Sequence, residues 1–264
     1  MFELFTMSLR EYWNETDESG EVTPQAEIDR SVEELQNVLT EHYGKVVSWQ
    51  EPEVDFSKRD EEITIDVIDE RQLASLHAVA AKLEVDGNLE GLEIDEEDPW
   101  ESEIFVRLSD LLDEAVDDDV EKFRHILSMG NNTEFVCIPV DLPFVAQISL
   151  DGEECGCDGE CHCHDEEPSV EDVECEDNGI EVSSLQALRR ELDEIAVFMD
   201  LDRNLDINDD DAMSFSDKDP LRFAKVAWYI ISHRVEESLK AGLPLIVRYT
   251  DDDYDDIDDG FDED

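Results

Sequence analysis

Residues Phe135-Val136-Cys137-Ile138-Pro139-Val140 form a strand-like stretch. Most of these side chains are β-branched or aromatic, the types that fit a pleated and half-buried sheet surface. Pro139 has no backbone N–H, so we expect it at an edge strand or at the end of a strand. Residues 144–150 are the candidate partner strand, with a turn at Asp141-Leu142-Pro143 between the two. The pair predicts a sheet near the middle of the chain.

Two helices and a strand are predicted on the C-terminal side of this pair. Ser183 or Ser184 can cap the first helix, whose apolar stripe is Leu185, Leu188, Leu192, Ile195 and Met199. Asp219-Pro220 predicts the start of the second helix, which runs to about residue 241 and ends at Gly242. Residues 243–247 are a candidate terminal strand.

The N-terminal side gives a less regular pattern. We expect residues 1–22 to be a flexible leader. Thr23 and Pro24 then begin a helix that ends at Gly44 and places its apolar residues on one face: Ile28, Val32, Leu35 and Leu39. Residues 46–49 are a short strand candidate. Residues 61–68 alternate as a half-buried strand does, with one face formed by Ile63, Ile65 and Val67.

Further elements are predicted between this strand and the central pair. Residues 70–83 have the spacing of a helix, with Leu73, Leu76, Ala80 and Leu83 on one side. Residues 104–106 (Ile-Phe-Val) are another strand candidate. Ser109 can cap a helix whose pattern resumes until Gly130.

Strands and helices mix without steady alternation, which predicts an α+β fold with a mixed sheet packed by about four to five helices. We divide the chain into five parts. These are a leader (1–22), an α+β core (23–150), an acidic Cys/His-rich loop (151–181), a helical part that completes the core (182–250) and a disordered acidic tail (251–264). One core with a long inserted loop is preferred over two domains.

The formal net charge is -57, from 76 Asp and Glu against 19 Lys and Arg. Residues 151–181 contain 14 acidic residues and residues 251–264 contain 10, with no Lys or Arg in either segment. Acidic residues also outnumber basic ones outside these two segments. In the preferred interpretation, the acidity is halophile-like and suits a high-salt cytoplasm, where ions screen the repulsion. In the alternative, the negative field mimics nucleic acid or docks a basic partner protein.

Direct binding of nucleic acid is not expected, because phosphate neutralisation requires clustered Lys and Arg. No apolar run approaches the ~18–20 residues that span a bilayer. The N-terminus has no basic region of the kind that begins a signal peptide. The expectation is a soluble cytoplasmic protein.

The chain concentrates metal-binding residue types in one short segment. Its candidate metal ligands are Cys155, Cys157, Cys161, His162, Cys163 and His164. Thiolates and imidazoles are preferred by Zn²⁺, with Cu⁺ as the alternative ion. The crowding differs from zinc-finger spacing. Disulfides are the weaker explanation without a signal peptide, and an exposed insertion with an incidental or redox role is the other alternative. Cys175 could join the site, whereas Cys137 is expected to be a buried thiol.

Residues 200–211 resemble an EF-hand calcium loop, with oxygen ligands at Asp200, Asp202, Asn204 and Asp206. The loop departs from the motif at its sixth position, where Leu205 replaces the usual Gly. It departs again at the twelfth, where Asp211 replaces Glu. Calcium binding is therefore the weaker metal hypothesis.

Catalysis has no visible signature, since no nucleophile elbow, phosphate-binding loop or zinc-protease motif is present. We interpret His77, His125 and His233 as structural residues of helices. The leading hypothesis is a non-catalytic binding or regulatory protein with an accessory metal-binding loop. The alternatives are an acidic inhibitor that docks a basic partner, and a small enzyme whose site forms only in three dimensions.

Overall fold

The computed structural model describes residues 1–14, 23–52, 64–95, 98–114, 122–130, 134–149, 179–202, 215–216 and 218–250. The described residues form six strands: β1 (Phe2–Thr6), β2 (Asp66–Ile68), β3 (Glu134–Ile138), β4 (Ala146–Ser149), β5 (Gly179–Ser184) and β6 (Leu245–Tyr249). The helices are α1 (Leu9–Tyr12), α2 (Gln25–Tyr43), α3 (Glu70–Asp86), α4 (Glu103–Glu114), α5 (Arg124–Leu127), α6 (Leu185–Phe198) and α7 (Arg222–Ala241), with a short 3-10 helix η2 (Pro99–Glu101).

The six strands form one sheet in the order β2-β1-β6-β3-β5-β4. Only β3 and β5 are parallel, and every other neighbouring pair is antiparallel. The predicted α+β fold with a mixed sheet is therefore confirmed. The described residues contain seven α-helices rather than four to five, because α1 and α5 are single turns of four residues. The sheet combines strands from both sides of the segment 150–178.

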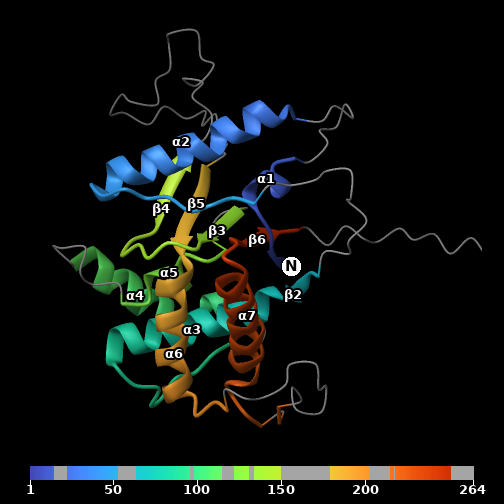
Figure 1. Cartoon of the computed structure of the whole chain (residues 1–264). Helices are drawn as coiled ribbons and strands as arrows, with labels where there is room; N and C mark the ends of the chain where they lie inside the picture. The colour runs from blue at the N-terminus through green and yellow to red at the C-terminus, as the bar shows by residue number, and fades with distance from the viewer. Residues whose placement is uncertain are drawn as a thin grey trace, which may run out of the picture.

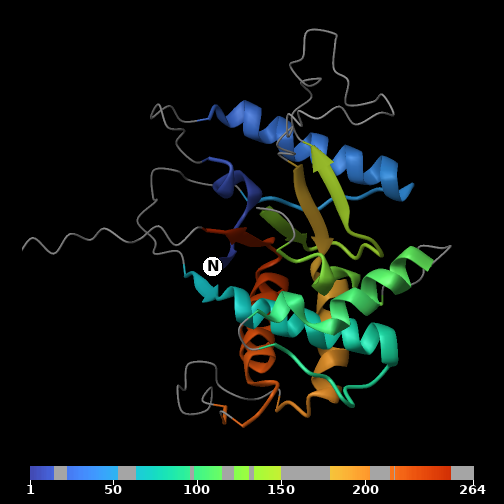
Figure 2. The same cartoon turned by 180° about the vertical axis from the view of Figure 1, so that it is seen from behind.

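Helices cover both faces of the sheet (Figure 1). The alternation of side chains along a strand sends Cys137 of β3 to one face and Val136 to the other. Cys137 lies in a core with α3, α5, α6 and α7, and Val136 lies in a second core with α1 and α2. Figure 2 shows α4 beside α3, where Ile104 and Leu108 pack on Ala78 and Ala81. The sheet is thus buried between two helical layers.

Several helix ends follow local rules that the sequence shows. Ser184 caps α6, with its side chain accepting a hydrogen bond from the Ala187 N–H at 3.1 Å. Gly44 and Gly242 close α2 and α7 with φ of 67° and 69°, a conformation that glycine adopts at no steric cost. These three predictions are confirmed.

Two strand predictions are wrong. Residues 46–49 form no strand, because both backbone groups of Val47 bond to the Thr40 side chain of α2. The Val47 N–H donates to the Thr40 hydroxyl at 2.9 Å, and this hydroxyl donates to the Val47 carbonyl at 3.3 Å. Residues 104–106 belong to α4, since Ile104 and Leu108 stand one turn apart and together face α3. Ser109 therefore lies inside α4 instead of capping a helix.

Three further expectations need correction. Residues 2–6, assigned to a flexible leader, form β1 between β2 and β6. The strand predicted over residues 61–68 is shorter, since β2 begins at Asp66; Ile68 is its buried side chain and Val67 is 42% exposed, whereas residues 61–63 lie outside the described residues. Strand β4 pairs with β5 rather than with β3, whose two neighbours are β5 and β6. Pro139 follows the last residue of β3, which confirms its place at a strand end.

Candidate functional site

Acidic residues dominate the described part of the chain, although less strongly than the whole sequence. The described residues contain 33 Asp and Glu and 16 Lys and Arg, a net charge of -17. Segments outside them therefore carry 40 of the 57 net negative charges. Within the described residues, acidity is concentrated on α2 and between residues 86 and 110, whereas residues 218–250 contain six basic and three acidic residues.

The outer face of α2 presents a row of exposed carboxylates: Glu27, Asp29, Glu33, Glu34 and Glu41. Its inner face buries Ile28, Val32, Leu35 and Leu39, and the last three pack in the core on this face of the sheet. An α-helix rises 1.5 Å per residue, so the row extends over about 21 Å with one carboxylate every 4–5 Å or so. Each strand of B-DNA carries one phosphate per about 3.4 Å of helix axis. Asp29 pairs with Arg10 at 2.9 Å, and Arg30 is also exposed on α2. The outer face of α2 is therefore acidic, with a lower net linear charge density than a single DNA strand.

A second acidic surface surrounds η2 and the start of α4. Its exposed carboxylates include Glu90, Glu93, Asp95, Asp98, Glu101, Glu103 and Asp110. The one cation in this part, Arg107, forms a bidentate pair with Asp86 at 2.5 and 3.1 Å. This pairing lowers the pKa of Asp86 to about 2. Two apolar side chains, Trp100 and Val106, are exposed among these acids.

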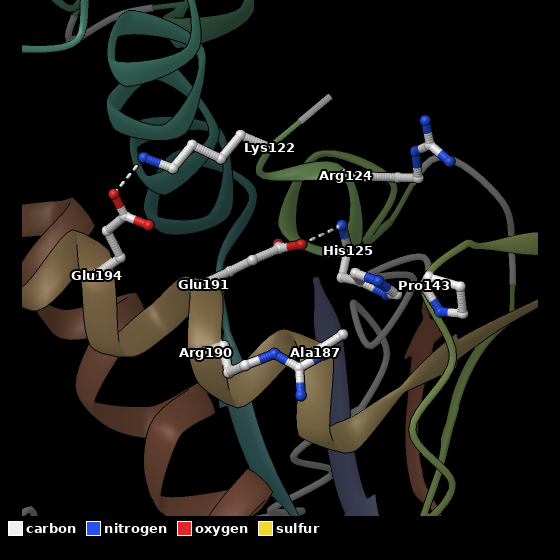
Figure 3. A pocket seen from close by; sticks show the side chains of 8 residues that line it. All are labelled: Lys122, Arg124, His125, Pro143, Ala187, Arg190, Glu191 and Glu194. Carbon is white, nitrogen blue, oxygen red and sulfur yellow. Dashed lines mark hydrogen bonds and ion pairs between the residues drawn. The ribbon is translucent and has the colours of Figure 1, made fainter. Parts of the chain in front are cut away.

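Figure 3 shows a hollow of about 340 Å³ between α5, the first turns of α6 and the loop before β4. It is lined by Lys122, Arg124, His125, Pro143, Ala187, Arg190, Glu191 and Glu194. Arg190 pairs with Asp141 through two contacts at 2.7 and 3.2 Å, and Lys122 pairs with Glu194. Because internal carboxylates neutralise these two cations, the hollow has mixed charge and does not form a basic patch.

Glu191 is the most deeply buried acid of this hollow. Its two carboxylate oxygens accept hydrogen bonds from the backbone N–H groups of His125 (3.2 Å) and Ile126 (2.9 Å). Burial raises the pKa of Glu191 to about 8 despite these donors. Glu84 of α3 accepts hydrogen bonds from the backbone N–H groups of Lys122 and Phe123, the two residues that precede α5. Two acids from neighbouring helices thus satisfy the open N-terminus of α5, a structural role.

His125 and Ser183 form a hydrogen-bonded pair, with 2.7 Å between Nδ1 and the hydroxyl oxygen. Burial and the nearby Arg124 lower the pKa of His125 to about 4. Cys137 lies beside the same hydroxyl, and burial raises its thiol pKa. Ser183 is fully buried, so the pair presents no nucleophile to the hollow. Cys137 is a buried thiol, as predicted.

These partners have no signal in the local sequence. Glu191 lies 65 residues from Ile126, and Ser183 lies 58 residues from His125. His125 is predicted on a helix, but nothing in the sequence connects it with Ser183 or Glu191. The contact arises only because β5 and α6 pack against α5.

The predicted metal ligands are not tested by this structure. Residues 155–164 lie outside the described residues, with Cys155, Cys157, Cys161, His162, Cys163 and His164 among them. Of the calcium candidates, Asn204 and Asp206 also lie outside, whereas Asp200 and Asp202 follow α6. The backbone carbonyl of Asp202 accepts a hydrogen bond from Tyr229 at 2.8 Å. In the part of the chain that is described, no group of three or more His, Cys, Asp or Glu could hold a metal ion.

None of the described helices combines the length and the apolar character needed to cross a membrane.

Comparison with protein families gives one match, over residues 6–247, to the family described as "Putative DNA-mimic protein". The match covers more than nine tenths of the chain. The chain belongs to this family. The matched residues extend from the last residue of β1 into β6, so the match includes the strands β2 to β5 and all the described helices. No curated protein and no solved structure matches the chain.

Proposed function

We propose that the protein is a non-catalytic acidic decoy, which occupies the nucleic-acid-binding surface of a basic partner protein. Membership of the DNA-mimic family is the observation that carries this proposal. It favours the alternative in which the negative field itself is functional. A surface of fixed carboxylates attracts a cationic groove at long range and raises the rate of association.

The geometry of α2 supports the proposal. Its row of carboxylates is held by a helix whose opposite side is buried in the sheet, so the charges are fixed relative to one another. Ordered charges lose less conformational entropy on binding than the same charges on a flexible chain. Because the outer face of α2 keeps a net negative charge along its length, it is complementary to a cationic groove that binds a DNA backbone.

The cations of the described residues are largely engaged within the protein, which argues against a direct role in binding nucleic acid. Ion pairs join Arg10 to Asp29, Lys225 to Asp219, Arg234 to Asp66 and Arg248 to Glu3. Cations held by internal carboxylates contribute little to the neutralisation of phosphates. A basic protein is therefore the fitting partner.

Competition against DNA tests the proposal. A labelled DNA duplex is bound to purified basic DNA-binding domains of several folds, and displacement by the acidic protein is followed by fluorescence anisotropy. We expect displacement from at least one domain, with an apparent affinity that falls steeply as salt rises. The proposal fails if none of the domains releases DNA at low salt under excess protein.

Matched variants locate the effect. Glu33→Gln, Glu34→Gln and Glu41→Gln together remove three charges from the outer face of α2 and should weaken displacement about tenfold or more. The control removes three charges from the α6 and α7 side of the molecule through Asp200→Asn, Glu236→Gln and Glu237→Gln. It should weaken displacement much less. Equal losses in both triple variants would mean that net charge alone acts, without a role for the row on α2.

A further inference from the structure

Trp100 is an exposed aromatic side chain in the middle of the acidic surface around η2. It is 36% exposed, and it is the one tryptophan among the exposed large apolar side chains of the described residues. Val106 of α4, six residues further along the chain, is 62% exposed. We call the set Glu70, Trp100, Glu101, Glu103 and Val106 the Trp100 surface. Its acids are exposed as well, so the exposed indole lies in an acidic part of the surface.

The indole of Trp100 is held in a defined orientation. Its Nε1–H donates to the Glu70 carboxylate at 3.2 Å. The ring of His77 meets it edge to face, with 5.2 Å between the centroids, and Phe105 lies at 5.3 Å. Contacts on these sides fix the ring while part of it stays open to a partner. An exposed and oriented tryptophan is the type of residue that dominates binding energy in protein interfaces.

His77 supplies an independent observation at the same place. It is 2% exposed, and one of its ring nitrogens donates a hydrogen bond to the backbone carbonyl of Ile126. The other nitrogen, Nε2, is buried without a hydrogen-bond partner. A buried acceptor that is left unsatisfied costs about 1–3 kcal/mol. The His77 ring contacts Trp100 with 5.2 Å between the centroids, so this unsatisfied nitrogen belongs to the side chain that supports the indole.

We propose that the Trp100 surface is a subsite for an arginine side chain of the basic partner. The guanidinium plane stacks on the indole, and its N–H groups reach the carboxylates of Glu101 or Glu103. Arginine fits this combination better than lysine does, because its planar fork stacks on aromatic rings and pairs with carboxylates in a bidentate manner. The inference rests on the proposed function and adds the side chain that the partner contributes.

Binding of two peptides tests the subsite. One peptide alternates Arg and Ala over ten residues, and the other has Lys in place of Arg. Affinities are measured by calorimetry, and the indole N–H resonance of Trp100 is followed by NMR in the full-length protein. We expect the Arg peptide to bind several times more tightly and to shift the Trp100 resonance. In Trp100→Ala the affinity for the Arg peptide should fall about fivefold to tenfold, and the preference over Lys should disappear.

Controls separate the subsite from general charge. Phe198→Ala removes another exposed aromatic side chain, which lies on α6, and should keep the preference for Arg. Should Trp100→Ala lose its helical circular dichroism signal, the double variant Glu101→Gln with Glu103→Gln replaces it and should reduce the preference as well. An undiminished preference in a folded variant overturns the subsite. The DNA competition assay is a separate measurement. If Trp100→Ala loses the preference for Arg but the unchanged protein displaces no DNA, only the decoy function is refuted.

Discussion

The carboxylate of Glu191 on α6 accepts a hydrogen bond from the backbone N–H of Ile126 on α5, at 2.9 Å. Its other oxygen accepts from His125. Glu191→Ala leaves both N–H groups without this partner in a buried place. We expect the free energy of unfolding to fall by about 2–4 kcal/mol, measured by urea denaturation.

The pH dependence of stability gives a second test of Glu191. Its pKa is raised from 4.5 to about 8 in the folded protein, so the folded state binds more protons than the unfolded state between these values. The contribution of Glu191 to stability therefore falls as pH rises from 4.5 to 8, and the decline should be seen above pH 6.5, where the buried histidines contribute little. Glu191→Gln cannot titrate and should flatten this decline. Glu194→Gln, an exposed change on the same helix, should keep the original slope; identical slopes in all three proteins would contradict the assignment.

The two buried histidines predict the opposite dependence at lower pH. Burial lowers the pKa values of His77 and His125 from 6.5 to about 4. The unfolded state then binds more protons between pH 4 and 6.5, so stability should be lost as pH falls through this range. His125→Gln should reduce the loss. His42→Gln, at an exposed position of α2, should leave it unchanged, and an equal effect of both variants would refute the explanation.

Gly130 combines a positive φ with a crowded position. Its φ is 82°, and an added Cβ would lie 2.8 Å from Leu73 Cδ2 and 2.9 Å from Phe2 Cε1. We expect Gly130→Ala to cost about 2–4 kcal/mol, from backbone strain and overpacking together. Gly91→Ala is the matched control, since its φ is 68° and its Cβ would meet nothing within 4 Å. It should cost only about 1–2 kcal/mol in thermal denaturation, and equal losses would show that packing around Gly130 is unimportant.

We further propose that Cys155, Cys157, Cys161 and Cys163, with His162 or His164, hold a zinc ion. The expected result is about one Zn²⁺ per chain by mass spectrometry, with these thiols protected from a thiol reagent until a chelator is added. Cys137→Ser should retain the metal, because Cys137 is buried in β3. Replacing the four loop cysteines with Ser should abolish binding. A metal-free protein whose thiols react freely in the presence of Zn²⁺ would end this hypothesis.

Salt distinguishes the two explanations of the acidity. A halophile-like protein with a net charge of -57 should gain helical circular dichroism signal as KCl rises to molar levels, because screening relieves repulsion. A negative surface built for a basic partner should give an unchanged signal from low salt upward. We expect the unchanged signal, in agreement with the proposed function. A large gain would restore the halophile interpretation.

Sequence patterns predicted the elements that carry their own signals. The apolar stripe and Ser184 cap of α6 lie within one segment, and so do the stripe of α7 and its closing Gly242. The errors arose where partners are distant. Ile104-Phe105-Val106 has strand propensity, yet packing of Ile104 on α3 makes it helical. Strand β4 follows β3 in the chain but pairs with β5, which begins about thirty residues later, and no local sequence signal predicts this pairing.

The functional surfaces were predicted only in part. Net charge made a basic partner conceivable, whereas the exposed position of Trp100 depends on the packing of η2 against α3. The carboxylate row of α2 could have been found from its helical spacing, because the buried stripe of Ile28, Val32, Leu35 and Leu39 fixes which face is outward.

At the centre of the sheet, a strand from the start of the sequence pairs with a strand from near its end. Strand β1 lies between β2 and β6, with Phe2 opposite Tyr249, and β6 also borders β3. During synthesis, β1 and β3 therefore leave the ribosome well before the strand that bridges them exists. Until residues 245–249 emerge, both strands keep unpaired backbone groups along one side, so closure of the sheet is a late and slow event.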